Sequence, residues 1–467
     1  MKRFLIRTYG CQMNVHDSEK ISNLLHHAGL RPAAAEAEAD LLLINTCSIR
    51  DKAEHRLYSD LGALRSWKSE RPRRVLAVGG CVAQQEGDTL LGRFSHVDFV
   101  FGTHNLRWVP SLVEAALAGE RGVQVEETSS PERFDLPERH PAYAGERVGR
   151  AFLTVMEGCD MFCSFCIVPR TRGREISRPA AGILSEARAL VARGVREFTL
   201  LGQTVNAYGR HERRRGKETV AGTLGFAELL YRLTEIPGVT RLRYISPHPI
   251  FFEEELIRAH AELASLCPHV HLPLQSGSDA VLARMRRRYT AERYLAIAEA
   301  LRRARPDIAL TTDLIVGFPG ESETDFEATL RLMREVHFVD SYSFKYSPRP
   351  GTAALRLPDA VPAEVAQERL ERLQGLQRHL TFEAHRARRG QLTEVLLEGL
   401  SRRGGRQWMG RDPYHRVVNL IPPPGEPWSV GQSVRVRIAE ATPHSLIGEP
   451  LDVGQAIPFE ECATGIA

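Results

Sequence analysis

The sequence has no apolar run of the ~18 residues that a membrane-spanning helix needs, and it has almost no surplus charge. Its net charge is +4 over 467 residues, so overall charge does not mark it as a nucleic-acid-binding protein. No signal-peptide pattern precedes the first strand-like segment, Phe4-Leu5-Ile6. We therefore expect a cytoplasmic protein without a membrane partner. At about 150 residues a domain, the length predicts roughly three domains.

Cysteine is also scarce, with eight residues widely scattered along the chain. Such scatter excludes the dense disulfide framework of a small secreted domain. The cysteines are therefore interpreted as reduced thiols or metal ligands. We expect Cys267 and Cys462 not to be ligands, because the first ends a helical segment and the second lies in a C-terminal tail.

Three of the cysteines form the run Cys159-x3-Cys163-x2-Cys166, and no fourth cysteine follows nearby. Four thiolates close an iron-sulfur cluster, so three leave one iron with an open position, as a catalytic cluster requires. Structural zinc is the alternative, but tetrahedral zinc sites usually take two pairs of ligands. The uneven spacing without a second pair favours the iron-sulfur cluster.

Residues 1–118 alternate short apolar runs with amphipathic helical stretches, which predicts a parallel sheet covered by helices. Three strand-like segments, at 4–8, 41–45 and 75–80, each lead to a cysteine. These cysteines are Cys11, Cys47 and Cys81. Carboxyl ends of parallel strands share one edge of a sheet, so we predict that the three thiols converge there and hold a second open iron-sulfur cluster. Taken singly, each is equally typical of a small buried apolar residue.

Residues 119–144 are rich in Pro, Glu, Arg and Ser, which predicts a linker with a short strand near 123–125. Residues 145–382 again alternate strands and helices. The expected strands are 151–156, 197–201, 241–245, 269–274, 308–316 and 341–346, and the expected helices are 185–192, 226–234, 253–266, 294–304 and 323–335. Six such β-α units predict an α/β fold with an open, incomplete β/α barrel.

The strand ends of this barrel carry polar and glycine-rich sequence at 202–206, 246–249, 275–278 and 317–321. Barrel enzymes place their chemistry at the carboxyl ends of the strands. One glycine-rich turn is weak evidence, because most such turns only reverse the chain. Four of them around the same mouth as the cysteine run indicate a cofactor site.

Residues 383–452 change to short strand-like segments separated by turns, which predicts a small β-barrel, followed by a tail at 453–467. The expected strands are 393–397, 407–410, 417–421, 434–438 and 445–448. The region holds 10 Arg and 8 acidic residues, so it is nearly neutral.

Several motifs together resemble known families. The run at 159–166, His-Leu-Pro-Leu-Gln-Ser-Gly-Ser at 271–278 and Asp-Leu-Ile-Val-Gly-Phe-Pro-Gly-Glu at 313–321 resemble the radical S-adenosylmethionine superfamily. Thr-Tyr-Gly-Cys-Gln-Met-Asn at 8–14, with the three N-terminal cysteines, is similar to the methylthiotransferases, and within them to the tRNA-modifying MiaB branch. Ser-Leu-Ile-Gly at 445–448 and its position resemble the TRAM domain, an RNA-binding module.

This resemblance, which covers essentially the whole chain, implies two 4Fe-4S clusters and S-adenosylmethionine as cofactors. The cluster on Cys159, Cys163 and Cys166 would bind S-adenosylmethionine and cleave it with one electron to a 5′-deoxyadenosyl radical. The other cluster would carry the sulfur, methylated by a first S-adenosylmethionine. A second molecule of S-adenosylmethionine would generate the radical that removes hydrogen from C2 of the target adenine. The net product would be a 2-methylthio group on that carbon.

The resemblance also suggests contact residues. Polar strand-end residues where the superfamily contacts its cofactor are Gly202, Gln203, Asn206, Gln275, Ser276 and Asp313. Residues of this type also cap helices and satisfy turns, which is the alternative. Of three basic clusters, at 170–178, 210–217 and 284–288, we expect the first to contact an RNA backbone, through Arg170, Arg172 and Arg174. The others are typical of a solvated surface or a helix end.

The implied substrate is the N6-isopentenylated adenosine 3′ of the anticodon, presented in a tRNA anticodon stem-loop, with an electron donor and a sulfur source as further partners. Sister methylthiotransferases that act on threonylcarbamoyladenosine or on a ribosomal-protein aspartate are the nearest alternative. A non-catalytic RNA-binding iron-sulfur sensor is an alternative from another class. Such a sensor needs neither two open clusters nor a cofactor-lined barrel mouth.

Overall fold

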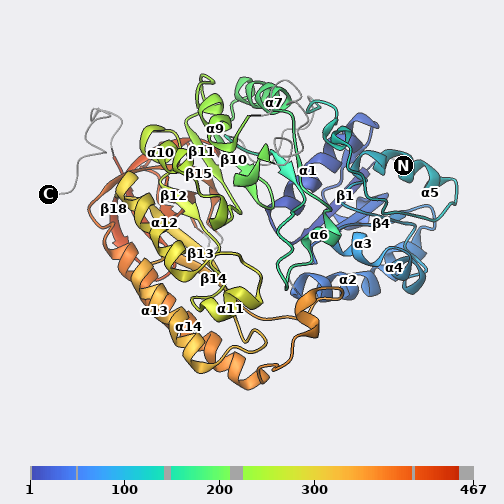
Figure 1. The fold of residues 1–467 in the computed structure, drawn as a ribbon. Helices are drawn as coiled ribbons and strands as arrows, with labels where there is room; N and C mark the ends of the chain where they lie inside the picture. The colour runs from blue at the N-terminus through green and yellow to red at the C-terminus, as the bar shows by residue number, and fades with distance from the viewer. Residues whose placement is uncertain (1–2, 49–50, 141–148, 211–223, 402–404, 452–467) are drawn as a thin grey trace.

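The computed structural model describes residues 3–48, 51–140, 149–210, 224–401 and 405–451. Cys462, the tail at 453–467 and the basic segment 211–217 lie outside these residues. The chain forms three parts, an N-terminal sheet, a central open barrel and a C-terminal closed barrel (Figure 1). No helix in the described part of the chain is long and apolar enough to cross a membrane.

The N-terminal part is a six-stranded sheet in the order β2-β1-β3-β4-β5-β6, and every pair in it is parallel. Its strands are β1 (Arg3–Tyr9), β2 (Arg31–Pro32), β3 (Leu41–Thr46), β4 (Val75–Gly80), β5 (Phe99–Phe101) and β6 (Gly122–Gln124). The two central strands, β3 and β4, are buried at every position, as a parallel sheet covered on both faces requires. The predicted parallel sheet is confirmed, and the short strand expected near residue 123 joins its edge.

Helices cover both faces of this sheet. They are α1 (Gln12–His27), α2 (Asp51–Glu70), α3 (Cys81–Glu86), α4 (Asp88–Arg93) and α5 (Val109–Leu117). Buried apolar residues of α1 and α5 pack on one face, and those of α2 and α4 pack on the other. This packing leaves the carboxyl edge of the sheet facing the central part of the chain.

The central part contains six parallel strands in two hydrogen-bonded sets. These are β7 (Arg150–Thr154), β10 (Glu197–Leu201) and β11 (Arg241–Tyr244), then β12 (His269–His271), β13 (Ala309–Val316) and β14 (Asp340–Lys345). A parallel bridge between Leu242 and Leu266 joins the sets. The covering helices are α7 (Ala180–Ala192), α9 (Phe226–Thr234), α10 (Glu254–Glu262), α12 (Ala291–Ala304) and α13 (Glu323–Val336). The predicted open six-unit barrel is confirmed.

Shorter elements surround the mouth of this barrel. They are the hairpin β8 (Met156–Glu157) and β9 (Ile176–Ser177), with α6 (Val168–Thr171) and α11 (Asp279–Arg284). The cysteine run at 159–166 lies in the loop between β8 and α6. The loop therefore follows the first barrel strand, β7, with only Val155 and β8 between them.

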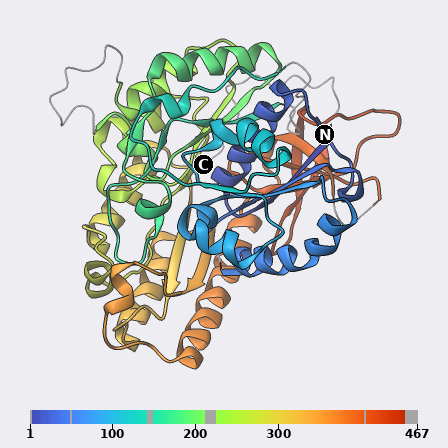
Figure 2. The same cartoon turned by 90° about the vertical axis from the view of Figure 1, so that its right-hand side faces the viewer.

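One long helix that the sequence analysis does not name, α14 (Ala363–Arg386), packs along β14 and leads into the C-terminal barrel (Figure 2). Leu373 and Leu380 of this helix belong to the core of the central part. The domain boundary expected at residue 383 falls inside α14, so the two parts are joined by continuous helix. The other domain boundaries stay predictions.

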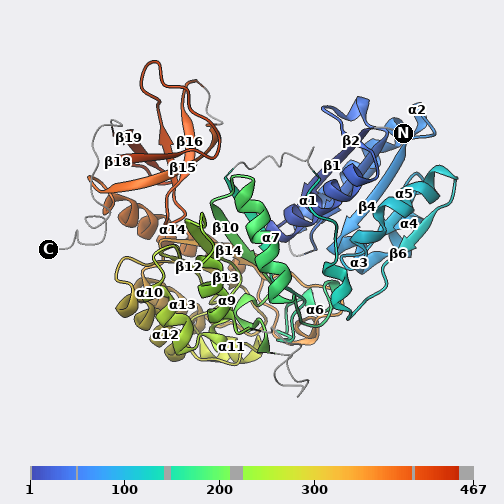
Figure 3. The same cartoon turned by 90° about the horizontal axis from the view of Figure 1, so that it is seen from above.

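The C-terminal part is a closed barrel in the order β15-β16-β17-β19-β18, as predicted. Its strands are β15 (Leu392–Leu400), β16 (Trp408–Arg411), β17 (Val417–Leu420), β18 (Ser433–Ala441) and β19 (Leu446–Pro450). In Figure 3 this barrel lies at the upper left and the N-terminal sheet at the upper right, with the central part below them.

A buried ionic group docks the closed barrel on the central part. Glu197, at the start of β10, accepts from Arg243 Nε at 3.1 Å and pairs with Arg241 Nη1 at 3.5 Å. Arg243 Nη2 donates to the carbonyl of Asp412 at 2.9 Å, and Arg241 Nη2 donates to the carbonyl of Glu394 at 2.8 Å. The carboxylate of Glu197 therefore orients two arginines that donate hydrogen bonds to the backbone of the closed barrel.

We expect Glu197→Gln to lower the free energy of unfolding by about 3–5 kcal/mol, because it removes the carboxylate paired with buried Arg243 and leaves buried Arg241 with only the half-exposed Glu394, at 3.7 Å. Burial alone would raise the pKa of Glu197, but Arg243 and Arg241 outweigh it and hold that pKa below its ordinary value. The Glu197 carboxylate therefore makes its full contribution to the free energy of unfolding at any pH above the ordinary glutamate pKa. This stabilisation is lost as the pH falls through the lower pKa of the folded state. The difference from wild type should shrink accordingly in acid.

Urea unfolding of the full chain across pH measures this effect. Glu228→Gln is the matched control, because Glu228 makes only an exposed pair with Arg232 at 3.9 Å and should change stability by less than about 1 kcal/mol. Equal stability of the two variants at neutral pH would contradict the prediction.

Candidate active site

The three N-terminal cysteines lie at one edge of the sheet. β1, β3 and β4 are neighbours, with Tyr9 opposite Thr46 and Thr46 opposite Gly80. Each cysteine follows its strand by one or two residues, and the Cys47 backbone N–H donates to the carbonyl of Tyr9 at 3.0 Å. The thiol of Cys47 interacts with those of both Cys11 and Cys81. The structure thus brings together the three residues that the strand positions predict.

Two glycines make this convergence possible. Gly10 has φ +137°, and a Cβ added there would lie 2.3 Å from Cys47 Cβ. Gly80 has φ +95°, and its Cβ would lie 2.4 Å from Asn45 Oδ1. Side chains rarely adopt these backbone angles, and no atom fits in the space. Both positions therefore require glycine for the cysteine-bearing loops to approach one another.

Buried amides support the loops from below. Asn45 Nδ2 donates to the carbonyl of Asn14 and to Ser18 Oγ, both at 2.9 Å. Cys11 Sγ donates to Asn14 Oδ1 at 3.4 Å. These contacts fix the start of α1 against the end of β3, and so fix Cys11 relative to Cys47.

The thiols in this group differ in acidity. The hydrogen bond with Cys47 lowers the pKa of Cys11 to about 6 and that of Cys81 to about 7, with Arg172 adding to both shifts. The same contacts raise the pKa of Cys47 well above its ordinary value. Thiolates are the metal-binding form of cysteine, so the site favours ligation by Cys11 and Cys81 near neutral pH.

The second group, Cys159, Cys163 and Cys166, lies across from the first, in the loop after β8. Cys159 Sγ is 3.1 Å from Thr204 Oγ1, and Cys163 Sγ accepts from Arg287 Nη1 at 3.4 Å. Burial raises the pKa of Cys159 to about 11 and that of Cys166 to about 12. These thiols therefore need a bound cation to be held as thiolates.

One cavity of about 850 Å³ joins the two groups, and all six cysteines line it. From the cysteines it continues past His271 and Tyr342 to the junction of α14 with the closed barrel. Side chains at that far end are Gln377, Arg378, His385, Arg411, Tyr414, His415, Arg416 and His444. The two cysteine groups thus open onto the same space, which is long enough to reach the C-terminal barrel.

Four of the six predicted cofactor residues line this cavity, namely Gly202, Gln203, Gln275 and Asp313. Gln203 Oε1 accepts from the backbone N–H of Gly158 at 2.6 Å, which ties the cysteine loop to the end of β10. Asp313 Oδ2 lies 3.3 Å from His271 Nε2. Gln275 has φ +76°, a left-handed backbone conformation that is unusual outside glycine.

The other two predicted contacts lie behind the cavity. The amide of Asn206 donates to the carbonyl of His248 at 3.0 Å and accepts from its N–H at 2.8 Å, so it joins the ends of β10 and β11. Ser276 is fully buried, with Oγ 3.3 Å from Thr329 Oγ1. These two residues therefore stabilise the loops at the barrel mouth without facing the cavity. This is the alternative role stated for polar strand-end residues, which also satisfy turns.

The three arginines expected to contact RNA differ in the structure. Arg170 and Arg174 are exposed, and Arg174 Nε donates to Asp160 Oδ1 at 2.6 Å. Arg172 is buried, and its Nη2 donates to Asp17 Oδ2 at 2.6 Å. The prediction for Arg172 is corrected, because a guanidinium buried against a carboxylate at the cysteine sites does not present itself to an RNA backbone.

Arg172 belongs to a buried ionic joint between the N-terminal sheet and the central part, formed by Asp17, Arg172, Glu157, Arg133 and Lys20. Glu157 pairs with Arg133 at 2.8 Å and with Lys20 at 3.5 Å. Burial would raise the pKa of Glu157, but Arg133 and Lys20 outweigh it and hold the pKa at about 2. Arg172 acts on the thiols of Cys11 and Cys81, and Glu157 stands two residues before Cys159, so the joint fixes the two cysteine groups relative to each other.

Arg287, Thr204 and His271 were not predicted as site residues. Thr204 falls within the strand-end segment 202–206 and His271 within the motif at 271–278, and their polar character is the available signal. Arg287 stands in the basic cluster at 284–288, and nothing in that run distinguishes it from its neighbours. Only the fold separates the buried Arg287 from the exposed Arg286 and Arg288.

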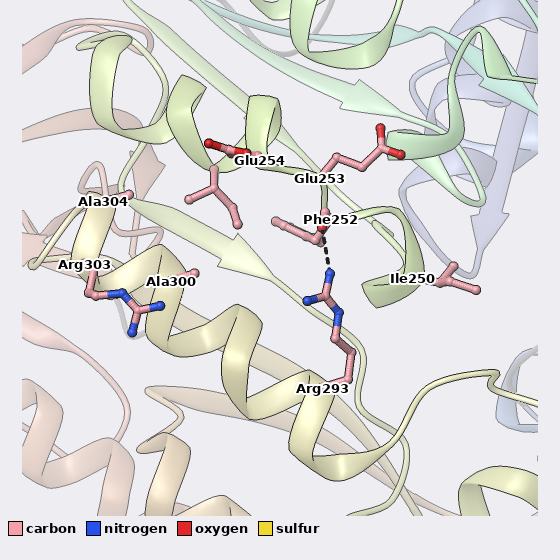
Figure 4. A pocket seen from close by; sticks show the side chains of 9 residues that line it. Ile250, Phe252, Glu253, Glu254, Arg293, Ala300, Arg303 and Ala304 are labelled. Carbon is pink, nitrogen blue, oxygen red and sulfur yellow. Dashed lines mark hydrogen bonds between the residues drawn. The ribbon is translucent and has the colours of Figure 1, made fainter.

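A second hollow of about 770 Å³ lies between α10 and α12, and no cysteine lines it (Figure 4). Arg293 reaches across it to donate to the carbonyl of Phe252 at 3.5 Å. The hollow is on the helical layer outside the barrel strands, away from the cysteine groups.

Three family models match successive parts of the chain. Uncharacterized protein family UPF0004 matches residues 3–102, the Radical SAM superfamily matches 153–333 and the TRAM domain matches 386–451. Among solved structures, the fold is similar to the radical S-adenosylmethionine methyltransferase TsrM from Kitasatospora setae with cobalamin and a [4Fe-4S] cluster bound. The TM-score is 0.53 at 16% identity, over 76% of this chain and 77% of that chain.

Curated relatives match over nearly the full length. The tRNA-2-methylthio-N(6)-dimethylallyladenosine synthase of Geobacter metallireducens is 50% identical over 96% of this chain and 98% of its own length. The protein of the same name from Acidithiobacillus ferrooxidans is 48% identical over 96% of this chain and 97% of its own.

The open six-unit barrel, with a cysteine run at its mouth, defines a radical S-adenosylmethionine enzyme, a class that uses S-adenosylmethionine and a 4Fe-4S cluster. Within that class, the chain belongs to the family of tRNA-2-methylthio-N(6)-dimethylallyladenosine synthases.

Proposed function

We propose that this enzyme adds a methylthio group to C2 of N6-isopentenyladenosine beside the anticodon of tRNA, giving 2-methylthio-N6-isopentenyladenosine. The observation that carries the proposal is the single cavity lined by both cysteine groups. A site that must both generate a radical and deliver sulfur to the same carbon needs both functions within reach of one bound base.

Each cysteine group would hold one 4Fe-4S cluster, with Cys159, Cys163 and Cys166 on one and Cys11, Cys47 and Cys81 on the other. The donor sets fit, because each offers three thiols to a common cavity and so leaves one iron open. When bound, the clusters supply one-electron cleavage of S-adenosylmethionine and the sulfur for transfer.

The chain's own residues would bind and orient S-adenosylmethionine at the barrel mouth. Gly202 lines the cavity with its backbone and packs closely on Met156, since a Cβ at this position would lie 2.6 Å from Met156 Cγ. Asp313, oriented by His271, offers a carboxylate to a hydroxyl or ammonium group in the cavity. Gln203 positions the cysteine loop, and Gln275 offers a further amide.

The far end of the cavity suits tRNA. Arg378, Arg411 and Arg416 line it where α14 meets the closed barrel, so backbone phosphates of the anticodon stem-loop would lie against cationic groups. The target base would be splayed out of the loop and read inside the cavity. Arg170 and Arg174 supply further exposed positive charge near the cysteine loop.

We also propose that the enzyme works in the cytoplasm, where tRNA is modified, with two further partners. A one-electron donor must reduce the cluster at the barrel mouth in each cycle. A sulfur source must replace the sulfur lost with each product, because the reaction consumes it.

Incubation of the anaerobically reconstituted enzyme with S-adenosylmethionine, a reductant and anticodon stem-loops tests the proposal. One stem-loop carries isopentenyladenosine and a matched one carries threonylcarbamoyladenosine. We expect 5′-deoxyadenosine and a methylthio nucleoside only with the first, measured by mass spectrometry. Formation of 5′-deoxyadenosine without a methylthio nucleoside from either stem-loop would contradict the tRNA assignment.

A smaller substitution tests the N-terminal site. We expect Gly10→Ala to reduce bound iron to about half of the wild-type content. The added Cβ would overlap Cys47 Cβ, and its φ of +137° strains any side chain, so the two cysteines cannot both keep their places. Iron content per chain and 5′-deoxyadenosine formation are the measurements, and the latter should persist.

Gly62→Ala is the control for this substitution. A Cβ at Gly62 meets nothing within 4 Å and lies inside α2, so the variant should keep all its iron and gain about 0.5–1 kcal/mol of stability. Full iron content in Gly10→Ala would show that the N-terminal site tolerates the displacement.

A further inference from the structure

The cysteine loop after β8 is fastened to the segment that follows α11. The backbone N–H of Ser164 donates to the carbonyl of Met285 at 3.0 Å, and Ser164 Oγ donates to the carbonyl of Arg284 at 2.8 Å. The positions of Cys163 and of residues 284–289 are therefore coupled.

Arg287 points from this segment into the protein. It is 6% exposed, whereas Arg286 and Arg288 beside it are exposed and have φ of +59° and +62°. Left-handed backbone on both sides is costly for residues other than glycine and persists only where the surrounding contacts demand it. Here it turns one guanidinium inward while its neighbours face solvent.

The buried guanidinium of Arg287 donates hydrogen bonds in three directions, and within the described part of the chain none of them goes to a carboxylate. Nη1 donates to Cys163 Sγ at 3.4 Å, Nη2 to the carbonyl of Pro273 at 3.1 Å and Nε to Tyr289 Oη at 3.0 Å. Tyr289 Oη in turn donates to the carbonyl of Leu274 at 2.7 Å, which fixes the phenol. A buried cation is expensive without a negative partner, and among these groups only the sulfur can carry negative charge as a metal ligand.

We propose that Arg287 is a positioning residue that sets the reduction potential of the iron-sulfur cluster at the barrel mouth, through its hydrogen bond to Cys163 Sγ. This inference rests on the proposed function, in which Cys163 is a ligand of that cluster. Reduction adds one electron from an external one-electron donor and no proton, so the cluster gains one negative charge. A fixed cation at a ligand sulfur stabilises the reduced form more than the oxidised form, and so makes the cluster easier to reduce.

Arginine suits this role better than lysine. Its planar guanidinium keeps its charge and serves the sulfur, the phenol and the carbonyl at once in a fixed geometry. Lysine would keep the positive charge but could not make the same set of planar hydrogen bonds. Comparing Arg287→Gln with Arg287→Lys therefore separates the effect of the charge from that of the hydrogen-bond geometry.

The test uses the full chain with Cys11, Cys47 and Cys81 replaced by alanine, so that one cluster alone titrates. Arg287→Gln, Arg287→Lys and the control Arg286→Gln are reduced at a series of fixed solution potentials, and the reduced cluster is counted by electron paramagnetic resonance. We expect Arg287→Gln to lower the ratio of reduced to oxidised cluster about tenfold at any fixed potential, which is 59 mV for one electron. Arg287→Lys should fall between, and Arg286→Gln should stay within about twofold of the parent.

Iron content separates the outcomes. Full iron with an unchanged ratio in Arg287→Gln overturns the proposal, and so does loss of iron in both Arg287 variants, because Arg287 would then only hold the loop. If instead the parent chain binds no iron at the barrel mouth, the assignment of Cys159, Cys163 and Cys166 itself fails.

Discussion

Replacing Cys11, Cys47 and Cys81 together by alanine is expected to leave about half of the iron bound, because the other cysteine group holds its own four-iron cluster. S-adenosylmethionine should still be cleaved to 5′-deoxyadenosine, while the methylthio nucleoside should fall below detection. The reason is that the two groups lie on different elements, at the sheet edge and after β8, so the loss of one leaves the geometry of the other intact. Iron analysis and product analysis by mass spectrometry measure both parts.

Cys267→Ala is the matched control for this variant. Cys267 is buried like Cys47 and Cys81 but does not line the cavity, so its replacement should cost about 1 kcal/mol of stability and no iron. Loss of all iron from the triple variant would contradict two independent sites.

Replacing Cys163 alone by alanine is expected to abolish both 5′-deoxyadenosine and the methylthio nucleoside, while about half of the iron remains. Removal of one ligand from a three-cysteine site leaves too few thiolates to hold the cluster with a single open iron. The reaction then lacks its radical source, and the sulfur-bearing site is idle. Product formation with S-adenosylmethionine and an anticodon stem-loop is the measurement.

The two cysteine variants are expected to differ in what they retain. The triple alanine variant keeps cleavage of S-adenosylmethionine and loses sulfur transfer, whereas Cys163→Ala loses both. Cleavage at an undiminished rate in Cys163→Ala would show that Cys163 is dispensable and would remove the basis for a cluster in the loop after β8.

Much of the architecture follows from periodicity. The N-terminal sheet, the six barrel units and the closed C-terminal barrel were all predictable, because buried parallel strands appear as short apolar runs between helices. The long helix α14 was not predicted, although Leu370, Leu373, Leu376 and Leu380 recur at helical spacing and pack on the core of the central part. This apolar stripe was the signal that could have revealed the helix.

The convergence of the cysteines was also predictable, because each follows a strand and parallel strands end at a common edge. The sequence did not predict which polar strand-end residues line the cavity. Gln203 and Asn206 are both amides after β10, yet Gln203 lines the cavity whereas Asn206 is hydrogen-bonded to the backbone of His248. The outcome depends on a neighbouring loop that is distant in sequence.

The sequence also could not predict which charged side chains are buried. Arg172 and Arg287 resemble their exposed neighbours in sequence, and their burial depends on partners supplied by the fold, Asp17 in one case and Cys163 in the other. A charge pattern records what a side chain carries but not where its partner lies. The basic segment at 213–217 lies outside the described residues and stays a prediction.

The buried ionic joint of Asp17, Arg172, Glu157, Arg133 and Lys20 has a consequence for protein engineering. Because its charges come from both sides of the boundary, neither side can be exchanged without the other. A chimera that joins this barrel to an N-terminal sheet without Asp17 and Lys20 would leave Arg172 without its carboxylate between the two cysteine groups, unless the joint is transplanted as a unit. The modules are separate in sequence, but they are not interchangeable parts.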